Sequence, residues 1–450
     1  MKKTQTLIFK NGVRLAVAVA AIASMSSVCL ADSALFDYVN RPDSTFAWRV
    51  ASQSETDQGT VYNLELTSQT WQGITWKHGL HIIKPAVLER PDYALLFITG
   101  GDNDHVHLQL QPAPNNEEVQ IFARVAQAVG SVVCVLSQIP NQPLYDGLEE
   151  DALIVYTFDK FLNTLDPTWP LLLPMTKGAV KAMDATQAFA KEKLGLTISS
   201  FVVSGGSKRG WTTWLTGAVD PRVKAIAPMV IDVLNMRQQM PHQLESWGAY
   251  SEEIEDYTRL HIQERMGTPD GEKLTNIVDP FSYRDRLTIP KLIVLGTNDP
   301  YWPVDAVNLY FGQLKGDKHI LYVPNVGHGL GSKREALGGL VAFFRQIAAG
   351  AGLPRLSWEF KLEATGITLA IAPQTKPVEV NLWTAQSPTT DFRKATWAKS
   401  PISADAQGGY TRTADIPQTG YLACYGEVVY PGAPGPTYSL CTNARVFGKQ

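Results

Sequence analysis

Residues 201–210 read FVVSGGSKRG and join two different kinds of sequence. The residues up to this turn, Thr197 to Val203, are rich in β-branched and aromatic side chains and predict a buried strand, whereas Trp211 to Leu215 can continue as a helix. Two glycines before the second serine allow a tight bend between strand and helix. On such a bend Ser207 would present its hydroxyl at the carboxyl edge of a parallel sheet, beside the amides of a helix start. The stretch therefore predicts a nucleophile.

This turn is similar to the nucleophile elbow of α/β-hydrolases, whose usual pattern is G-x-S-x-G. Gly205 stands two residues before Ser207, as the pattern requires, but Arg209 stands two residues after it and the glycine follows only at Gly210. Glucuronoyl esterases, an α/β-hydrolase family, have a similar G-x-S-basic-x-G turn, so the departure is compatible with the chemistry. Short motifs also recur by chance, and a plain Gly-Ser turn between a strand and a helix is the alternative.

Two further residues supply the partners that a serine nucleophile needs. Asp299 follows a buried apolar run in KLIVLGTNDP, and His328 follows the next one in HILYVPNVGHGL. The order Ser, Asp, His is that of α/β-hydrolases. His328 would take the serine proton, and Asp299 would hold the imidazole tautomer and stabilise the cation that forms. Each residue also has an ordinary interpretation, Asp299 as a turn residue and His328 as a loop histidine. Three such signals at successive strand ends favour the catalytic interpretation.

The acid has a second candidate. Asp232 also follows a strand, in the sequence VIDV, and some α/β-hydrolases use that earlier position. We favour Asp299 because of its strand-end sequence GTND.

The other apolar segments predict an α/β fold with a mostly parallel central sheet. Tyr93–Ile98 and Ser131–Ile139 are continuous apolar runs separated by a helical stretch, 117–129, which is typical of parallel strands buried on both faces. Residues 43–85 instead alternate between apolar and polar side chains, which predicts antiparallel strands at the start of the sheet. About sixty residues separate the two strands that follow the elbow, too many for a plain loop, so we expect a cap insertion at about 235–288.

Two features bear on the oxyanion and the substrate. In α/β-hydrolases the loop after the first of these parallel strands supplies a second oxyanion amide, and here that loop holds Gly100 and Gly101, although an ordinary turn is the alternative. Lys208 and Arg209 place two cations at a helix start, against the helix dipole, so an acidic group should face them.

That acidic group has two possible sources. If it belongs to the substrate, or is the oxyanion itself, Lys208 would favour a carboxylated ester. If it belongs to the protein, the basic pair is structural, and carboxylates of the pocket would hold a cationic peptide. The candidates for these carboxylates are Glu149, Glu150, Glu252 and Glu253.

The first 31 residues predict a secretory signal peptide: basic residues precede an apolar core, 15–22, and a small-residue cleavage site at 29–31. The core is short for a retained membrane anchor, and no later segment approaches a spanning length. We therefore expect an exported protein, periplasmic or secreted. The net charge of −3 gives no basic excess for nucleic acid. We expect neither a cofactor nor a metal.

The sequence of 450 residues predicts three parts. After the signal peptide we expect an α/β-hydrolase domain at 32–350. At 355–450 short strands separated by Pro, Gly and Ser turns predict a small C-terminal β-sandwich. Cys424 and Cys441 lie close together in this tail and are predicted to form a disulfide in an oxidising compartment. The sequence gives no oligomeric state.

Six longer segments carry a family resemblance: DALIVYTFDKFL, LLLPMTKGAVKAMDA, VSGGSKRGWTTW, APMVIDVLNM, GTNDPYWPVDA and VPNVGHGL. They resemble the PhoPQ-activated pathogenicity-related proteins, over nearly the whole chain after the leader. The resemblance implies an exported α/β-hydrolase-like protein, which in bacteria is linked to a virulence regulon that responds to antimicrobial peptides and low magnesium. The resemblance includes the positions of Ser207, Asp299 and His328. Peptidase activity resembling that of dipeptidyl peptidases is suggested for eukaryotic members.

Two functions from different classes follow. One is a serine hydrolase that cleaves a peptide or a small ester, and the implied link to antimicrobial peptides favours a peptide with a free amino end. The other is a catalytically silent hydrolase-fold protein that acts by binding a receptor or a surface. The complete set of Ser207, Asp299 and His328 favours the enzyme.

Overall fold

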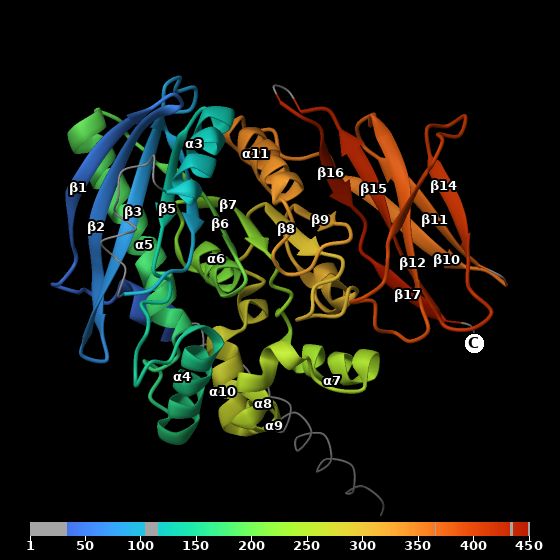
Figure 1. Ribbon diagram of the computed structural model, residues 1–450, viewed down its shortest axis with the longest axis horizontal. Helices are drawn as coiled ribbons and strands as arrows, with labels where there is room; N and C mark the ends of the chain where they lie inside the picture. The colour runs from blue at the N-terminus through green and yellow to red at the C-terminus, as the bar shows by residue number, and fades with distance from the viewer. Residues whose placement is uncertain (1–33, 104–115, 365, 433–434, 449–450) are drawn as a thin grey trace, which may run out of the picture.

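The computed structural model describes residues 34–103, 116–364, 366–432 and 435–448 (Figure 1). The predicted signal peptide at 1–31 lies outside them. Across the described part of the chain, no helix combines the length and the apolar character that crossing a membrane requires.

One sheet runs through the protein, and its central strands are parallel, as predicted (Figure 1). The first three strands form an antiparallel end, and six parallel strands follow in the order β5-β4-β6-β7-β8-β9. Most residues of the parallel strands are buried, and β5 and β8 are buried along their whole length, because helices cover both faces. The bounds are β1 (Ala47–Thr56), β2 (Gly59–Trp71), β3 (Ile74–Pro85), β4 (Tyr93–Ile98), β5 (Val132–Leu136), β6 (Ser200–Gly206), β7 (Val223–Met229), β8 (Lys291–Gly296) and β9 (Lys318–Val323).

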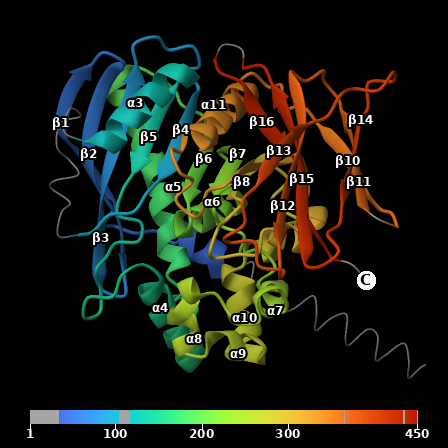
Figure 2. The ribbon, with the colours of Figure 1, turned by 45° about the vertical axis from the view of Figure 1, so that its right-hand side comes forward.

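Two helices lie on each face of the parallel strands (Figures 1 and 2). The pair α3 (Glu117–Val129) and α11 (Arg334–Ala348) contributes to one apolar core, and the pair α5 (Leu172–Phe189) and α6 (Lys208–Val219) contributes to the other. This is the α/β-hydrolase arrangement, in which the residues at the carboxyl ends of the strands are left accessible for chemistry.

Between β7 and β8 the chain leaves the sheet and forms a group of short helices. Together with α4 (Glu150–Thr164) they lie side by side below the sheet in the views of Figures 1 and 2. We call this group the cap. Its other members are α7 (Met236–Trp247), α8 (Glu255–Arg259), α9 (Ile262–Met266) and α10 (Pro269–Val278). The residue limits given above for the domains and the insertion stay a prediction.

The C-terminal strands form two antiparallel layers that share a core, a small β-sandwich. One layer continues the central sheet, because Cys441 on its edge strand pairs with Ile320 of β9. Its strands are β12 (Glu379–Ser387), β13 (Ala398–Pro401), β15 (Tyr421–Tyr430), β16 (Tyr438–Cys441) and β17 (Arg445–Gly448). The other layer contains β10 (Leu356–Leu362), β11 (Gly366–Pro373) and β14 (Tyr410–Asp415).

The predicted disulfide between Cys424 and Cys441 is wrong, because the two side chains point to opposite faces of one sheet. Both cysteines are free and buried. Cys441 pairs across the strands with Glu427, and an offset of three residues along β15 turns Cys424 to the other face. Accordingly, the two cysteines belong to different apolar cores. The sequence showed only that they are near one another, not which way each points.

We expect both thiols to stay reduced in exported protein. Burial raises the pKa of the Cys424 thiol to about 12, so the reactive thiolate is scarce, and the sulfur of Cys441 lies in the opposite core. Alkylation of denatured, unreduced periplasmic material followed by mass spectrometry should find both residues as free thiols. A linked pair of peptides containing Cys424 and Cys441 would contradict this register.

Candidate functional site

The turn at Ser207 has the backbone of a strained elbow. β6 ends at Gly206, α6 begins at Lys208, and Ser207 between them has a φ of 57° and a ψ of −129°. Such a conformation is unfavourable for a residue other than glycine and is found mainly at functional sites. The Ser207 amide is held by the carbonyl of Met229 on β7, at 2.9 Å.

Close packing explains why the second glycine of the motif stands at position 210. A Cβ on Gly210 would lie 2.9 Å from the carbonyl oxygen of Met229, and one on Gly205 would lie 2.8 Å from the carbonyl oxygen of Arg209. The side chain at position 209 instead extends away to the carbonyl of Ile139 and to Glu150, to both of which Arg209 donates. The departure from G-x-S-x-G therefore leaves the elbow itself intact.

His328 and Asp299 meet at the carboxyl ends of β8 and β9. The imidazole Nδ1 lies 2.9 Å from Oδ2 and 3.1 Å from Oδ1 of Asp299, which is 7% exposed. If Nδ1 donates to this carboxylate, Nε2 carries a lone pair. That Nε2 is buried and has no hydrogen-bond partner among the described residues, and His328 and Ser207 line the same pocket. The arrangement can accept a proton from a hydroxyl.

Asp232, the alternative acid, occupies a different place. It is 2% exposed, and burial together with the negative charges of Asp299 and Asp305 raises its pKa to about 7. The structure brings Asp299, and not Asp232, to the histidine, because β8 and not β7 is the neighbour of β9.

The acid that faces Lys208 and Arg209 belongs to the protein. The Lys208 ammonium lies 2.8 Å from Glu150 and 3.1 Å from Asp151, both on α4, and Arg209 NH1 donates to the same Glu150 at 2.8 Å. Burial acts to raise the pKa of Glu150, but hydrogen bonds and charge from Arg209 and Lys208 outweigh it and lower that pKa to about 2. Of the two alternatives for the basic pair, this geometry supports the structural one.

Gly100, the first of the two predicted oxyanion glycines, Gly100 and Gly101, lies beside this ion pair. A Cβ on Gly100 would come within 2.6 Å of the Arg209 guanidinium, so a glycine there lets the guanidinium pass on its way to Glu150. The described lining of the pocket includes neither glycine. Their role as oxyanion donors stays a prediction.

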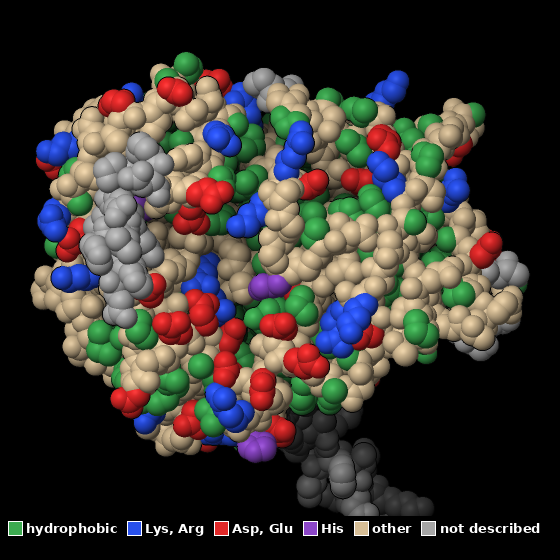
Figure 3. Space-filling view, viewed as in Figure 1, with side chains coloured by type: hydrophobic (Ala, Val, Ile, Leu, Met, Phe, Trp, Pro, Cys, Tyr) green, Lys and Arg blue, Asp and Glu red, His purple; other side chains and the backbone are tan. Residues whose placement is uncertain are grey.

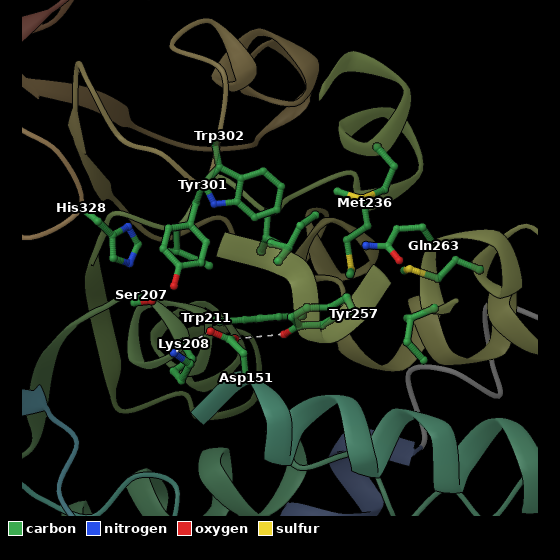
Figure 4. A pocket seen from close by; sticks show the side chains of 16 residues that line it. Asp151, Ser207, Lys208, Trp211, Met236, Tyr257, Gln263, Tyr301, Trp302 and His328 are labelled. Atoms are coloured by element: carbon green, nitrogen blue, oxygen red, sulfur yellow. Dashed lines mark hydrogen bonds and ion pairs between the residues drawn. The ribbon is translucent and has the colours of Figure 1, made fainter. Parts of the chain in front are cut away.

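The pocket runs from Ser207 beneath the cap (Figure 4). Most of its wall is apolar, and cap residues contribute much of it. The apolar lining is Trp211, Ile231, Val233, Met236, Met240, Ile254, Ile262, Met266 and Trp302. The polar lining is Asp151, Ser207, Lys208, Tyr257, Gln263, Tyr301 and His328.

Among the carboxylate candidates named from the sequence, Glu149, Glu252 and Glu253 are exposed and do not line this pocket, and Glu150 is paired as described. Asp151 is the acidic side chain of the described lining, and it accepts a hydrogen bond from Tyr257 at 3.2 Å as well as facing Lys208. Among the described residues, no group of three or more His, Cys, Asp or Glu is placed to hold a metal ion.

Tyr301 is a site residue that the sequence analysis missed. Its ring lies against the His328 imidazole, with centroids 4.2 Å apart and planes inclined by 32°, and its hydroxyl points toward Ser207 in Figure 4. Burial and the charges of Asp151 and Glu253 raise the pKa of this phenol, so it stays a donor. The available signal was its position two residues after Asp299.

Comparisons with known proteins found a matching family and a similar protein. The profile of the family described as PhoPQ-activated pathogenicity-related protein matches residues 35–393. Autocrine proliferation repressor protein A of Dictyostelium discoideum is 36% identical over 430 residues, which cover 88% of this chain and 85% of that protein.

Solved structures also align. Acetyl xylan esterase 1 from Thermoanaerobacterium sp. JW/SL YS485 is 15% identical, covers 70% of this chain and 93% of its own, and has a TM-score of 0.47. S-formylglutathione hydrolase from Agrobacterium tumefaciens is 13% identical, covers 68% of this chain and 100% of its own, and has a TM-score of 0.41.

Proposed function

The chain belongs to the family of PhoPQ-activated pathogenicity-related proteins, and on that premise we propose that it is an exported serine hydrolase with Ser207, His328 and Asp299 as its triad. One observation carries this proposal above the others. His328 is held by Asp299 through Nδ1, while its buried Nε2 has no partner among the described residues and lies in the pocket that Ser207 lines.

In the proposed reaction the Ser207 oxygen attacks the substrate carbonyl carbon, and its proton passes to His328 Nε2. The tetrahedral intermediate collapses, the leaving group departs with that proton, and an acyl-enzyme remains. Water then repeats the sequence and releases the acid. The first amides of α6 have no acceptor within their helix and lie beside the nucleophile, so they supply donors for the oxyanion, and the Tyr301 hydroxyl supplies another. These steps need no cofactor.

The substrate that this pocket favours is an ester of an apolar carboxylic acid. Nine apolar side chains make most of the wall, and the ionised groups in the lining, Asp151 and Lys208, are paired with each other. A free ammonium group would need an unpaired carboxylate, because burying a charge without a partner is strongly unfavourable. The predicted preference for a free amino end therefore loses its structural basis.

A cationic peptide is the second candidate, and one observation favours it. Acidic side chains gather on the visible surface of the cap in Figure 3. In the segment between β7 and β8, Glu252, Glu253 and Glu255 are exposed. An acidic surface attracts cations over a distance. A substrate panel distinguishes the two: hydrolysis of short apolar acyl esters supports the first, and activity confined to peptides with free amino ends reverses the choice.

Export and a role in pathogenicity are part of the proposal. The leader pattern at 1–31 supports export, and the printed family description supports a link to pathogenicity. Fractionation of cells that express the full chain should place the protein, shortened by the leader, in the periplasm or the medium. A protein of full length in the cytoplasm would refute this part alone.

The serine mechanism is tested with a fluorophosphonate probe, which reacts only with an activated serine. The wild-type protein should be labelled, and Ser207→Ala should not. No labelling of either protein would favour the catalytically silent alternative that acts by binding, and equal labelling of the two would show that the activated serine is not Ser207.

The Tyr301 hydroxyl gives a further prediction. Tyr301→Phe keeps the ring against His328 and removes one donor, so we expect kcat to fall by about 10²-fold, as for other single oxyanion donors, with little change in KM. Steady-state kinetics on an ester measure this. Tyr257→Phe is the matched control, because it removes a hydroxyl that donates to Asp151 instead, and it should change kcat by less than about fivefold. Equal losses in both variants would mean that the Tyr301 hydroxyl has no role of its own.

A further inference from the structure

The pocket contains one amide side chain whose hydrogen bonds are not made. Gln263 lies on the cap helix α9, and both its Oε1 and its Nε2 are buried without a partner in the part of the chain that the structure describes. In Figure 4 its amide group points into the pocket beside Met236, on the side away from His328. A buried amide with neither hydrogen bond made is unfavourable and asks for an explanation.

The neighbouring wall offers this amide nothing to bind. Met236, Ile262 and Met266 are apolar, and thioether sulfur is only a weak acceptor. The charged residues of the lining, Asp151 and Lys208, are paired with each other. A ligand that fills this end of the pocket would complement the amide by offering a donor and an acceptor side by side without a net charge. A carboxamide or a peptide group has this pattern.

The direction of the pocket shows which part of the substrate reaches Gln263. In the proposed reaction His328 gives its proton to the leaving group, so the leaving group lies on the histidine side of Ser207. The pocket extends from Ser207 in the other direction, as Figure 4 shows. It therefore receives the acyl group.

We propose that Gln263 is a specificity residue: it recognises a neutral amide at the end of an otherwise apolar acyl chain. This inference rests on the proposed hydrolase function, since it assigns the acyl half of the same site. The amide of the substrate would donate to Gln263 Oε1 and accept from Nε2, and the methionine and isoleucine side chains would cover the carbons between it and the scissile carbonyl.

Hydrolysis of paired p-nitrophenyl esters tests the proposal. One series has acyl chains of four to eight carbons that end in a carboxamide, and the other has chains that end in an isopropyl group of nearly the same shape. At the best length we expect the wild-type kcat/KM to be at least about tenfold higher for the carboxamide, because the isopropyl group leaves the Gln263 amide unpaired. Gln263→Met should remove this preference by lowering the carboxamide rate while leaving the isopropyl rate equal or higher.

Met266→Leu is the matched control. It changes an apolar residue of the same helix and wall, so it should alter both series alike and leave their ratio unchanged. Gln263→Met should also keep or raise the melting temperature, since it removes an unpaired polar group, and this excludes misfolding as the cause of a lost preference.

The outcomes separate the two proposals. Ser207-dependent hydrolysis with no carboxamide preference, or with a preference that survives in Gln263→Met, overturns the role of Gln263 and leaves the hydrolase standing. Absence of any Ser207-dependent hydrolysis overturns the proposed function. In that case calorimetric titration of Ser207→Ala with the methyl esters of both series still measures the acyl pocket, and equal affinity for the two end groups overturns the recognition of the amide as well.

Discussion

Replacing Ser207 by alanine is expected to lower kcat for ester hydrolysis by about 10⁵- to 10⁶-fold, which is the size of effect seen when a triad nucleophile is removed. No other hydroxyl can form the acyl-enzyme at the same point, so only the contribution of binding and of the oxyanion donors remains. The fold should be unaffected. Ser207 is partly exposed and already has a positive φ, so alanine meets the same backbone strain as serine.

Ser204 supplies the matched control for this experiment. It lies three residues earlier on β6, is fully buried, and donates to the carbonyl of Ala227 at 2.6 Å. Ser204→Ala should keep its activity and lose about 1 kcal/mol of unfolding free energy, because one buried carbonyl loses a hydrogen bond. Full esterase activity in Ser207→Ala would show that the elbow serine is not the nucleophile.

Replacing Asp299 by asparagine is expected to lower kcat by about 10⁴-fold, the size of effect known for this change in a Ser-His-Asp triad. The oxygen of the asparagine can still accept from the Tyr301 amide, as Asp299 Oδ1 does at 2.9 Å. Its NH₂ group would then face His328 Nδ1 and hold the imidazole in the other tautomer, with the proton on Nε2. That nitrogen could no longer take the proton of Ser207.

Asp232→Asn is the corresponding control, because Asp232 is a second buried aspartate near the site that does not bond to His328. Its pKa of about 7 means that the carboxyl is substantially protonated at neutral pH, so a neutral amide is a mild change. We expect kcat to change by less than about fivefold. Steady-state kinetics of both variants decide the assignment: a large loss in Asp232→Asn with activity kept in Asp299→Asn would move the acid to position 232.

Much of the fold follows from the sequence because its signals are local. Tyr93–Ile98 and Leu292–Leu295 are continuous apolar runs, which indicates strands covered on both faces, and the structure has β4 and β8 there. The turn at Ser207 was also readable, since Gly205 and Gly210 stand where a Cβ would collide with the backbone. Within this fold the chain order of serine, aspartate and histidine was enough to name the candidate triad.

Prediction from the sequence failed for features that depend on the direction in which a side chain points. Cys424 and Cys441 are near one another in the chain, but the register of β15 and β16 sends them into different cores. Likewise Lys208 and Arg209 required an acid, and only the packing of α4 against the elbow identified it as Glu150. Gln263 gave no signal of its own, and the signal for Tyr301 was only its position two residues after Asp299, because neither residue belongs to a motif with a defined spacing.

The sequence by itself thus determined the elements and their order: an α/β sheet, an elbow serine, and an aspartate and a histidine that follow later strands. These depend on contacts within a few residues, through propensity, hydrophobic period and backbone sterics. The tertiary structure alone decided which aspartate reaches His328, which carboxylates neutralise the basic pair, and how the cap closes an apolar pocket that ends in an unpaired amide. Those outcomes depend on contacts between segments that are distant in the chain, such as Arg209 with Glu150 at a separation of 59 residues and His328 with Asp299 at a separation of 29, and no local pattern encodes them.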